Sequence, residues 1–197
     1  MEKKFIEMLI RDCDQLLKLP EEAYYLVVPS LKEVNLKRGT VIKDQASVDK
    51  VSRYLCKGFI GSYRNEGQGL ELISIYQATD TVFDESSFRS GKPSDIILKS
   101  ISEVVFLELS GEAEGNLLNG HPRLTLLAHK MALRITERSR RVHAISKMGI
   151  EKGFETLMKE FPGLEAEVSN HDLGSFFGIH TRSVERWKHS QKDRNHD

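Results

Sequence analysis

Cysteine is almost absent from this chain of 197 residues, which contains only Cys13 and Cys56. Two thiols are too few for a zinc or iron–sulfur cage within one chain, so the sequence implies no metal site and no cofactor. Long hydrophobic runs are also missing, which excludes both a membrane-spanning segment and a signal-peptide core. We therefore expect a cytoplasmic protein with no membrane partner, in which both cysteines remain ordinary thiols.

The chain as a whole also lacks net charge, with 29 basic and 29 acidic residues. Its two parts differ, however. Residues 1–120 hold 15 Lys/Arg against 19 Asp/Glu, whereas residues 121–197 hold 14 against 10 and include all seven histidines. A basic C-terminal part favours a nucleic-acid partner. An uneven surface charge without any function explains the same counts equally well.

Hydrophobic spacing divides the chain into three parts. Residues 2–19 have helical spacing that ends at Pro20, and residues 31–109 contain seven or more short β-branched or alternating runs at intervals of about ten residues. Such runs predict an antiparallel β-roll (double-stranded β-helix). Helical spacing returns after Gly120. The expected fold class is α+β: a β-roll domain with a leading helix (1–120), a long helix (121–147) and a small α-helical domain (148–197).

Residues 170–189 match the helix-turn-helix pattern. Gly174 is small where the two helices cross, Gly178 suits the turn, and Ser169 with Asp172 forms a capping-box-like start. The second helix, about 181–191, would enter a DNA major groove. The candidate DNA contacts are Ser169, Thr181, Arg182, Ser183, Arg186 and Lys188. A purely structural two-helix corner is the alternative.

The long helix carries an apolar stripe at alternating steps of four and three residues, which is typical of a coiled-coil seam. Its members are Leu124, Ala128, Met131, Ile135, Arg138 and Val142. The stripe could pack against its own domain. We nevertheless expect a homodimer interface, because the helix links two domains and has no obvious covering partner. Arg138 within the stripe is unfavourable unless it pairs or snorkels.

This order of parts resembles the CRP/FNR family of bacterial transcription regulators over most of the chain. The likeness rests on Lys57-Gly58-Phe59, Asn65-Glu66-Gly67, residues 81–85 and the helix-turn-helix, and residues 154–164 are similar to a subgroup with a short DNA-binding region. It implies a cyclic-nucleotide-binding-like sensor domain. It also implies four partners: duplex DNA, a second copy of the chain, RNA polymerase and an unknown small-molecule effector. By resemblance Arg186 reads a guanine, and Ser169, Thr181 and Ser183 contact phosphates.

The sequence departs from family members that bind cyclic AMP, which read Gly-Glu at the pocket entrance and Pro-Arg further on. Here Asp84 replaces the glycine, Glu85 remains, and Ser94 follows Pro93 where that arginine would be. A lost guanidinium and an added carboxylate both oppose a bound phosphate, so we expect no cyclic-nucleotide binding. Any effector pocket would be lined by Glu85, Ser86, Ser87 and Ser94, although exposed surface serines are the alternative.

Two rival functions follow from other features. Only residues 188–197 follow the recognition helix, where relatives carry a β-hairpin wing, so Lys188, Lys192 and Arg194 would have to supply the wing's phosphate contacts. A regulator that acts through protein contacts without DNA is therefore the second hypothesis. A cupin-like enzyme is the third, but no histidine precedes His121 and adjacent Asp84 and Glu85 point to opposite faces of a strand. The leading expectation is a dimeric, sequence-specific DNA-binding regulator and not an enzyme.

Overall fold

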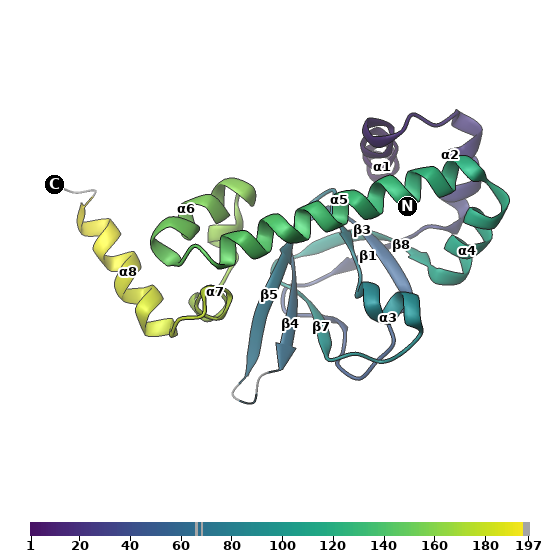
Figure 1. Ribbon diagram of the computed structural model, residues 1–197. Helices are drawn as coiled ribbons and strands as arrows, with labels where there is room; N and C mark the ends of the chain where they lie inside the picture. The colour runs from purple at the N-terminus through teal and green to yellow at the C-terminus, as the bar shows by residue number, and fades with distance from the viewer. Residues whose placement is uncertain (66, 68, 195–197) are drawn as a thin grey trace.

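The computed structural model describes residues 1–65, 67 and 69–194, with side chains up to Gln191 in the last helix. A β-roll lies beside a long helix, α5 (Pro122–Ser146), and a group of shorter helices extends from the far end of α5 (Figure 1). The predicted α+β class, with a roll, a long helix and terminal helices, is confirmed. Among the described residues, no helix combines the length and apolar content needed to cross a bilayer.

The roll consists of two four-stranded antiparallel sheets. The first has the order β1 (Lys32–Leu36), β8 (Val104–Ser110), β3 (Val51–Lys57) and β6 (Thr81–Val82). The second has the order β2 (Val41–Lys43), β7 (Ile96–Ser100), β4 (Ile60–Asn65) and β5 (Leu70–Tyr76). Alternate residues of both sheets, such as Leu55, Leu98 and Phe106, point inward and are fully buried. At the β4–β5 tip, the expected turn residue Glu66 lies outside the described residues.

Helices cover the outer face of the first sheet. These are α1 (Lys3–Leu16), α2 (Glu21–Val27) with a 3₁₀ turn (Val28–Ser30), and α4 (Gly111–Gly120), while α3 (Glu85–Ser90) lies between β6 and β7. The outward-facing side chains Tyr54, Cys56 and Leu107 pack under α1 and the first half of α5. The leading helix α1 matches its prediction, whereas α2, α3 and α4 were not predicted, because six to ten residues are too few for a clear helical period.

The terminal helices are α6 (Ile150–Glu160), a 3₁₀ turn (Leu164–Ala166), α7 (Asn170–Phe177) and α8 (Thr181–Arg194). Their hydrophobic core is continuous with the second sheet, because Tyr63, Leu72 and Ile75 belong to the same buried cluster. Helix α7 lies against β5, as Figure 1 shows, and the Leu72 backbone N–H donates to Ser175 Oγ at 3.0 Å. The helix-turn-helix is therefore docked on the roll.

The apolar stripe of α5 faces its own chain. Leu124, Arg138 and Val142 are each at most 7% exposed, Leu124 under α1 and Val142 within the helix-turn-helix core. Arg138 pairs, as its position required: its Nε lies 2.7 Å from Asp80 Oδ2 and its guanidinium stacks on Tyr76. These three residues have almost no surface left for a second copy, so the seam expected between two chains is mainly intrachain packing here. The remaining members, Ala128, Met131 and Ile135, are half-buried.

Candidate functional site

The local geometry of the helix-turn-helix follows from three small residues. Ser169 caps α7, since its Oγ accepts from the Asp172 N–H at 3.0 Å and donates to the Asp172 carboxylate at 2.6 Å. A Cβ on Gly174 would approach the Ile179 carbonyl oxygen to 2.8 Å, so only glycine allows this helix crossing. Gly178 ends α7 at a φ of +68°. The expected cap, close crossing and turn are present, although the Asp172 carboxylate accepts from the Ser169 hydroxyl and not from its backbone N–H as in a full capping box.

The solvent face of α8 is basic. Arg182 and Arg186 are both exposed and lie one helical turn apart, on the same face. Neither forms an ion pair with any described residue, although most of the other described arginines do. Their guanidinium groups are therefore free to meet an anionic or hydrogen-bonding partner outside the chain.

The other predicted DNA contacts lie around these arginines but are less accessible. Thr181, Ser183 and Lys188 are half-buried, and Lys188 Nζ lies 5.6 Å from the ring centre of Phe154. Ser169 is half-buried and its hydroxyl is already used in the cap of α7, so it is the weakest phosphate-contact candidate. The side chains of Lys192 and Arg194 lie outside the described residues.

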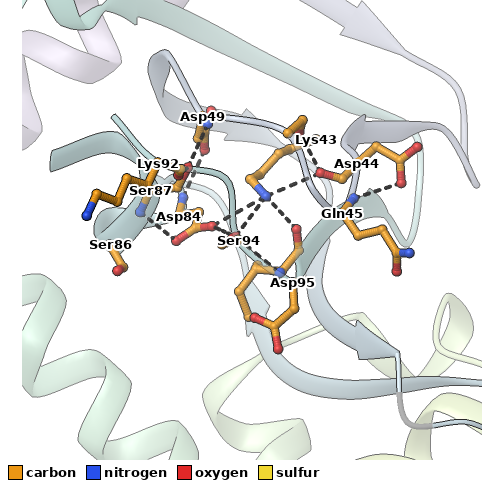
Figure 2. Close-up of polar contacts among 12 residues, drawn as sticks. Lys43, Asp44, Gln45, Asp49, Asp84, Ser86, Ser87, Lys92, Ser94 and Asp95 are labelled. Carbon is orange, nitrogen blue, oxygen red and sulfur yellow. Dashed lines mark hydrogen bonds and ion pairs between the residues drawn. The ribbon is translucent and has the colours of Figure 1, made fainter. Parts of the chain in front are cut away.

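A buried ion pair occupies the segment where the effector pocket was expected. Lys43 Nζ on β2 lies 3.4 Å from Asp84 Oδ2, and both side chains are at most 5% exposed. Figure 2 shows the ammonium group of Lys43 surrounded by oxygens: it donates to Ser94 Oγ at 3.0 Å and to the Ile96 carbonyl at 2.6 Å. The Ser94 hydroxyl in turn donates to the Asp84 carboxylate.

Asp84 also begins the α3 helix. Its Oδ1 accepts from the Ser87 N–H at 3.2 Å, which places a carboxylate at the positive end of this short helix. A second buried pair lies beside it: Arg53 Nη1 lies 3.1 Å from Asp49, whose Oδ2 accepts from the Asp84 N–H at 2.9 Å. The segment is therefore neutralised and hydrogen-bonded from within the chain. We call Lys43, Asp49, Arg53, Asp84 and Ser94 the polar network.

The structure does not bring the four predicted effector-pocket residues together around an opening. Ser87 is buried and donates to the Lys92 carbonyl at 2.6 Å, and Ser94 belongs to the polar network. Ser86 and Glu85 are exposed. Glu85 alone lines a cavity, and that cavity lies on the opposite, helix-covered side of the first sheet.

Sequence reasoning missed both Lys43 and this cavity. Lys43 sits in a three-residue strand, and nothing in Val41-Ile42-Lys43 shows that the lysine faces inward. The cavity has a volume of about 160 Å³ and mainly apolar walls contributed by α1, β3, β8, α4 and α5. Within the described part of the chain, no group of three or more His, Cys, Asp or Glu side chains is placed to hold a metal ion.

Comparison with known proteins gives matches to solved structures only. No protein-family model and no curated protein matches the chain. The c-di-GMP-responsive global regulator CLP of Xanthomonas campestris aligns with a TM-score of 0.69 at 14% identity, over 88% of this chain and 93% of that one. FixK2 of Bradyrhizobium japonicum gives 0.68 at 10% identity, over 84% and 86%.

Two further matches agree with these. The catabolite activator protein of Thermus thermophilus aligns at 0.53 and 17% identity, over 91% of this chain and 87% of that one. A cyclic nucleotide-binding domain from Methylobacillus flagellatus aligns at 0.62 and 14% identity, over 81% and 86%. The likeness covers the roll, the long helix and the terminal helices together. The chain therefore has the fold of the CRP/FNR-type transcription regulators, with a cyclic-nucleotide-binding-like roll followed by a helix-turn-helix.

Proposed function

We propose that the protein is a homodimeric transcription regulator that binds a two-fold symmetric DNA site through α8. The observation that carries this proposal is the exposed pair Arg182 and Arg186, which have no ion-pair partner among the described residues. An arginine on the solvent face of a recognition helix suits bidentate contact with guanine O6 and N7. The fold shared with CLP and FixK2 supports the same role.

The dimer is proposed to form through α5, but mainly through the face opposite to the predicted stripe. Leu126 and Leu133 are 48% and 52% exposed, and their spacing of seven residues places them on one side of the helix. Apolar side chains this exposed are unfavourable in water and suit burial against a second copy. Met131 and Ile135 lie on the stripe side of α5, where they line the cavity, so the proposed interface does not include them.

The regulator is also proposed not to bind cyclic nucleotides. A cyclic phosphate would meet the Asp84 carboxylate at the start of α3, and the positive charge of Lys43 is already balanced by that carboxylate. Binding would require two buried charges to separate without the arginine that pairs with the phosphate in cyclic AMP-binding relatives. Losing one charge-assisted contact costs roughly 1.5–3 kcal/mol, and the repulsion between the two anions adds to this.

The DNA proposal is tested by selecting a site from a randomised duplex pool and measuring affinity by fluorescence anisotropy at several salt concentrations. Arg186→Ala should lose about 1–3 kcal/mol and relax the preference for one guanine in each half-site. Lys188→Ala should weaken all sequences alike and lower the salt slope by about one, as loss of a phosphate contact does. Half-sites should be about one helical turn apart.

Arg11→Ala is the matched control, because Arg11 is an exposed arginine of α1 in the other domain. It removes the same charge and should change neither affinity nor preference. If Arg186→Ala behaves like this control, α8 does not read bases. If wild-type protein selects no sequence at all, a regulator that acts through protein contacts is the better account.

A further inference from the structure

The two exposed leucines of α5 belong to a regular stripe on the solvent side of the helix. Its members follow one another at steps of three, four and three residues and are all exposed: Leu126, His129, Leu133 and Thr136. These steps correspond to the a and d positions of a heptad, so the four side chains lie in one line. Lys130 is half-buried and lies beside this line. We call the four residues the outer stripe.

The outer stripe would bring two copies of His129 together. In a parallel two-fold pairing of helices, each residue of the seam faces its own symmetry mate. The two imidazole rings would therefore meet between a layer formed by Leu126 and a layer formed by Leu133. Those leucines are 48% and 52% exposed in the single chain, and their burial in a dimer would exclude water around the rings.

The charge of histidine decides whether such a layer is stable. A neutral imidazole has one donor and one acceptor nitrogen, so two neutral rings can hydrogen-bond to each other. Two protonated rings have donors only and carry like charges, and even one charged ring is unfavourable between apolar layers. Histidine is the side chain that ordinarily changes its charge between pH 5 and pH 8.

Among the described residues, no acidic side chain is placed to balance a charged His129. Glu137 is the only acidic residue of α5 and lies eight residues further on, about 12 Å along the helix. Lys130 adds a like charge, and Glu112 begins α4, whose opposite end hydrogen-bonds α5. The other acidic groups near α5 are paired with arginines: Asp12 with Arg134, Asp80 with Arg138, Glu114 with Arg89 and Glu160 with Arg141.

The contact should be confined to the first half of α5. Arg140 and Lys147 are exposed and continue the spacing of the leucines, seven and fourteen residues after Leu133. A symmetric seam would place each of these cations against its own mate, so the two helices should separate in this half. His143 is exposed there as well, but it would not be brought against a second copy of itself.

We propose, on the basis of the α5 dimer proposed above, that His129 makes dimerisation depend on pH. Two chains associate through the outer stripe while His129 is neutral, and they separate when it is protonated. The dimer then binds fewer protons than two single chains do, so association weakens as the pH falls through the titration range of histidine. A regulator that reads two half-sites as a dimer would thereby lose its DNA affinity in acid.

The test is sedimentation equilibrium of the full-length protein, without DNA, at pH 7.5 and pH 5.5 and at one ionic strength. Circular dichroism at both pH values checks that the chain stays folded. For two groups with histidine's reference pKa of about 6.5, which must both be neutral in the dimer, the dimer Kd should rise about a hundredfold between these pH values.

Two variants assign the effect to His129, whose exposure in the single chain lets both of them fold. His129→Gln keeps a polar side chain that cannot be protonated, so its dimer Kd should be the same at both pH values. His129→Leu completes an apolar seam and should give a tighter dimer that is also independent of pH. His143→Gln and His171→Gln are the controls, since they remove exposed histidines of α5 and α7 outside the contact. Both should keep the wild-type pH dependence.

The possible failures can be told apart. If wild-type protein has the same dimer Kd at both pH values, or if His129→Gln keeps the full pH dependence, His129 does not control dimerisation and this proposal is overturned, while the α5 dimer stands. If wild-type protein is monomeric at pH 7.5, the proposed dimer itself is wrong and the role of His129 is overturned with it.

Discussion

Replacing Lys43 by methionine should severely destabilise the β-roll. The substitution keeps the length and most of the volume of the side chain but removes the ammonium group that faces Asp84 at 3.4 Å. The Asp84 carboxylate, which is only 5% exposed, would keep the hydrogen bonds donated by the Ser94 hydroxyl and the Ser87 N–H but would lose its only cationic partner in the polar network. The Ile96 carbonyl would also lose its donor at 2.6 Å.

The expected loss follows from the burial of both groups. Removing one partner of a buried ion pair costs about 3–5 kcal/mol, because the other charge remains buried and uncompensated. For a chain of this size that loss corresponds to a fall of roughly 6–20 °C in Tm. Urea unfolding followed by circular dichroism measures it directly.

Two comparisons isolate the buried charge as the cause. Lys43→Met with Asp84→Asn removes both charges and keeps a side-chain oxygen for the α3 cap, so the double variant should recover part of the loss. Lys159→Met removes an ammonium group that lies closer to its partner, 2.7 Å from Glu155, but both of those side chains are exposed. It should leave the unfolding midpoint unchanged. If Lys43→Met lowers the free energy of unfolding by less than about 1 kcal/mol, or if the double variant is no more stable than Lys43→Met, an uncompensated buried charge is not the cause of the loss.

Three further predictions follow from other parts of the molecule. In the proposed dimer, Leu133→Glu should give monomers in sedimentation experiments. Met148→Glu changes a similarly exposed side chain outside α5 and should leave the sedimentation unchanged. A dimeric Leu133→Glu variant would place the interface elsewhere. Cyclic AMP and cyclic GMP should give no binding heat up to about 1 mM, and micromolar binding would contradict our account of the polar network. Burial raises the pKa of both the Cys13 and Cys56 thiols to about 12. At pH 8 only about one thiol in 10⁴ is then ionised, so iodoacetamide should label neither in the folded protein and both in urea; labelling of the folded protein at the rate of free cysteine would show that these thiols are accessible.

The helix-turn-helix was predictable because its signals are local. The cap formed by Ser169 and Asp172 spans three residues, and Gly174 meets Ile179 within the same motif. Each of these interactions can be read from residue types at fixed spacing, without knowledge of the rest of the fold. The strands were predictable for the same reason, since an alternating pattern needs only neighbouring residues.

The polar network was not predictable because its partners come from distant segments. The pattern of cyclic AMP-binding family members identified Asp84 and Ser94 as departures from a phosphate site. The sequence showed no cation to balance the Asp84 carboxylate. That cation comes from Lys43, on a strand that pairs with β7, whose Ile96 carbonyl it reaches. The cavity is likewise a property of packing: Tyr54 and Thr81 become neighbours only when β3 and β6 pair.

The stripe on α5 shows how far a periodic pattern can be interpreted. Its spacing indicates that one face of the helix is buried, but not whether the same chain or a second copy buries it. The charge of Arg138 distinguishes between these two possibilities. In a parallel two-fold seam each stripe residue faces its own symmetry mate, so two Arg138 side chains would be brought together as like charges.

Packing within one chain avoids this repulsion, because a different segment can supply a carboxylate. Asp80 does so at 2.7 Å, and although burial raises the pKa of Asp80, the guanidinium group of Arg138 opposes that rise and favours the ionised pair. A lone arginine in an apolar stripe therefore favours intrachain burial over a symmetric seam. The same reasoning leaves the uncharged, exposed Leu126 and Leu133 as the part of α5 best suited to meet a second copy.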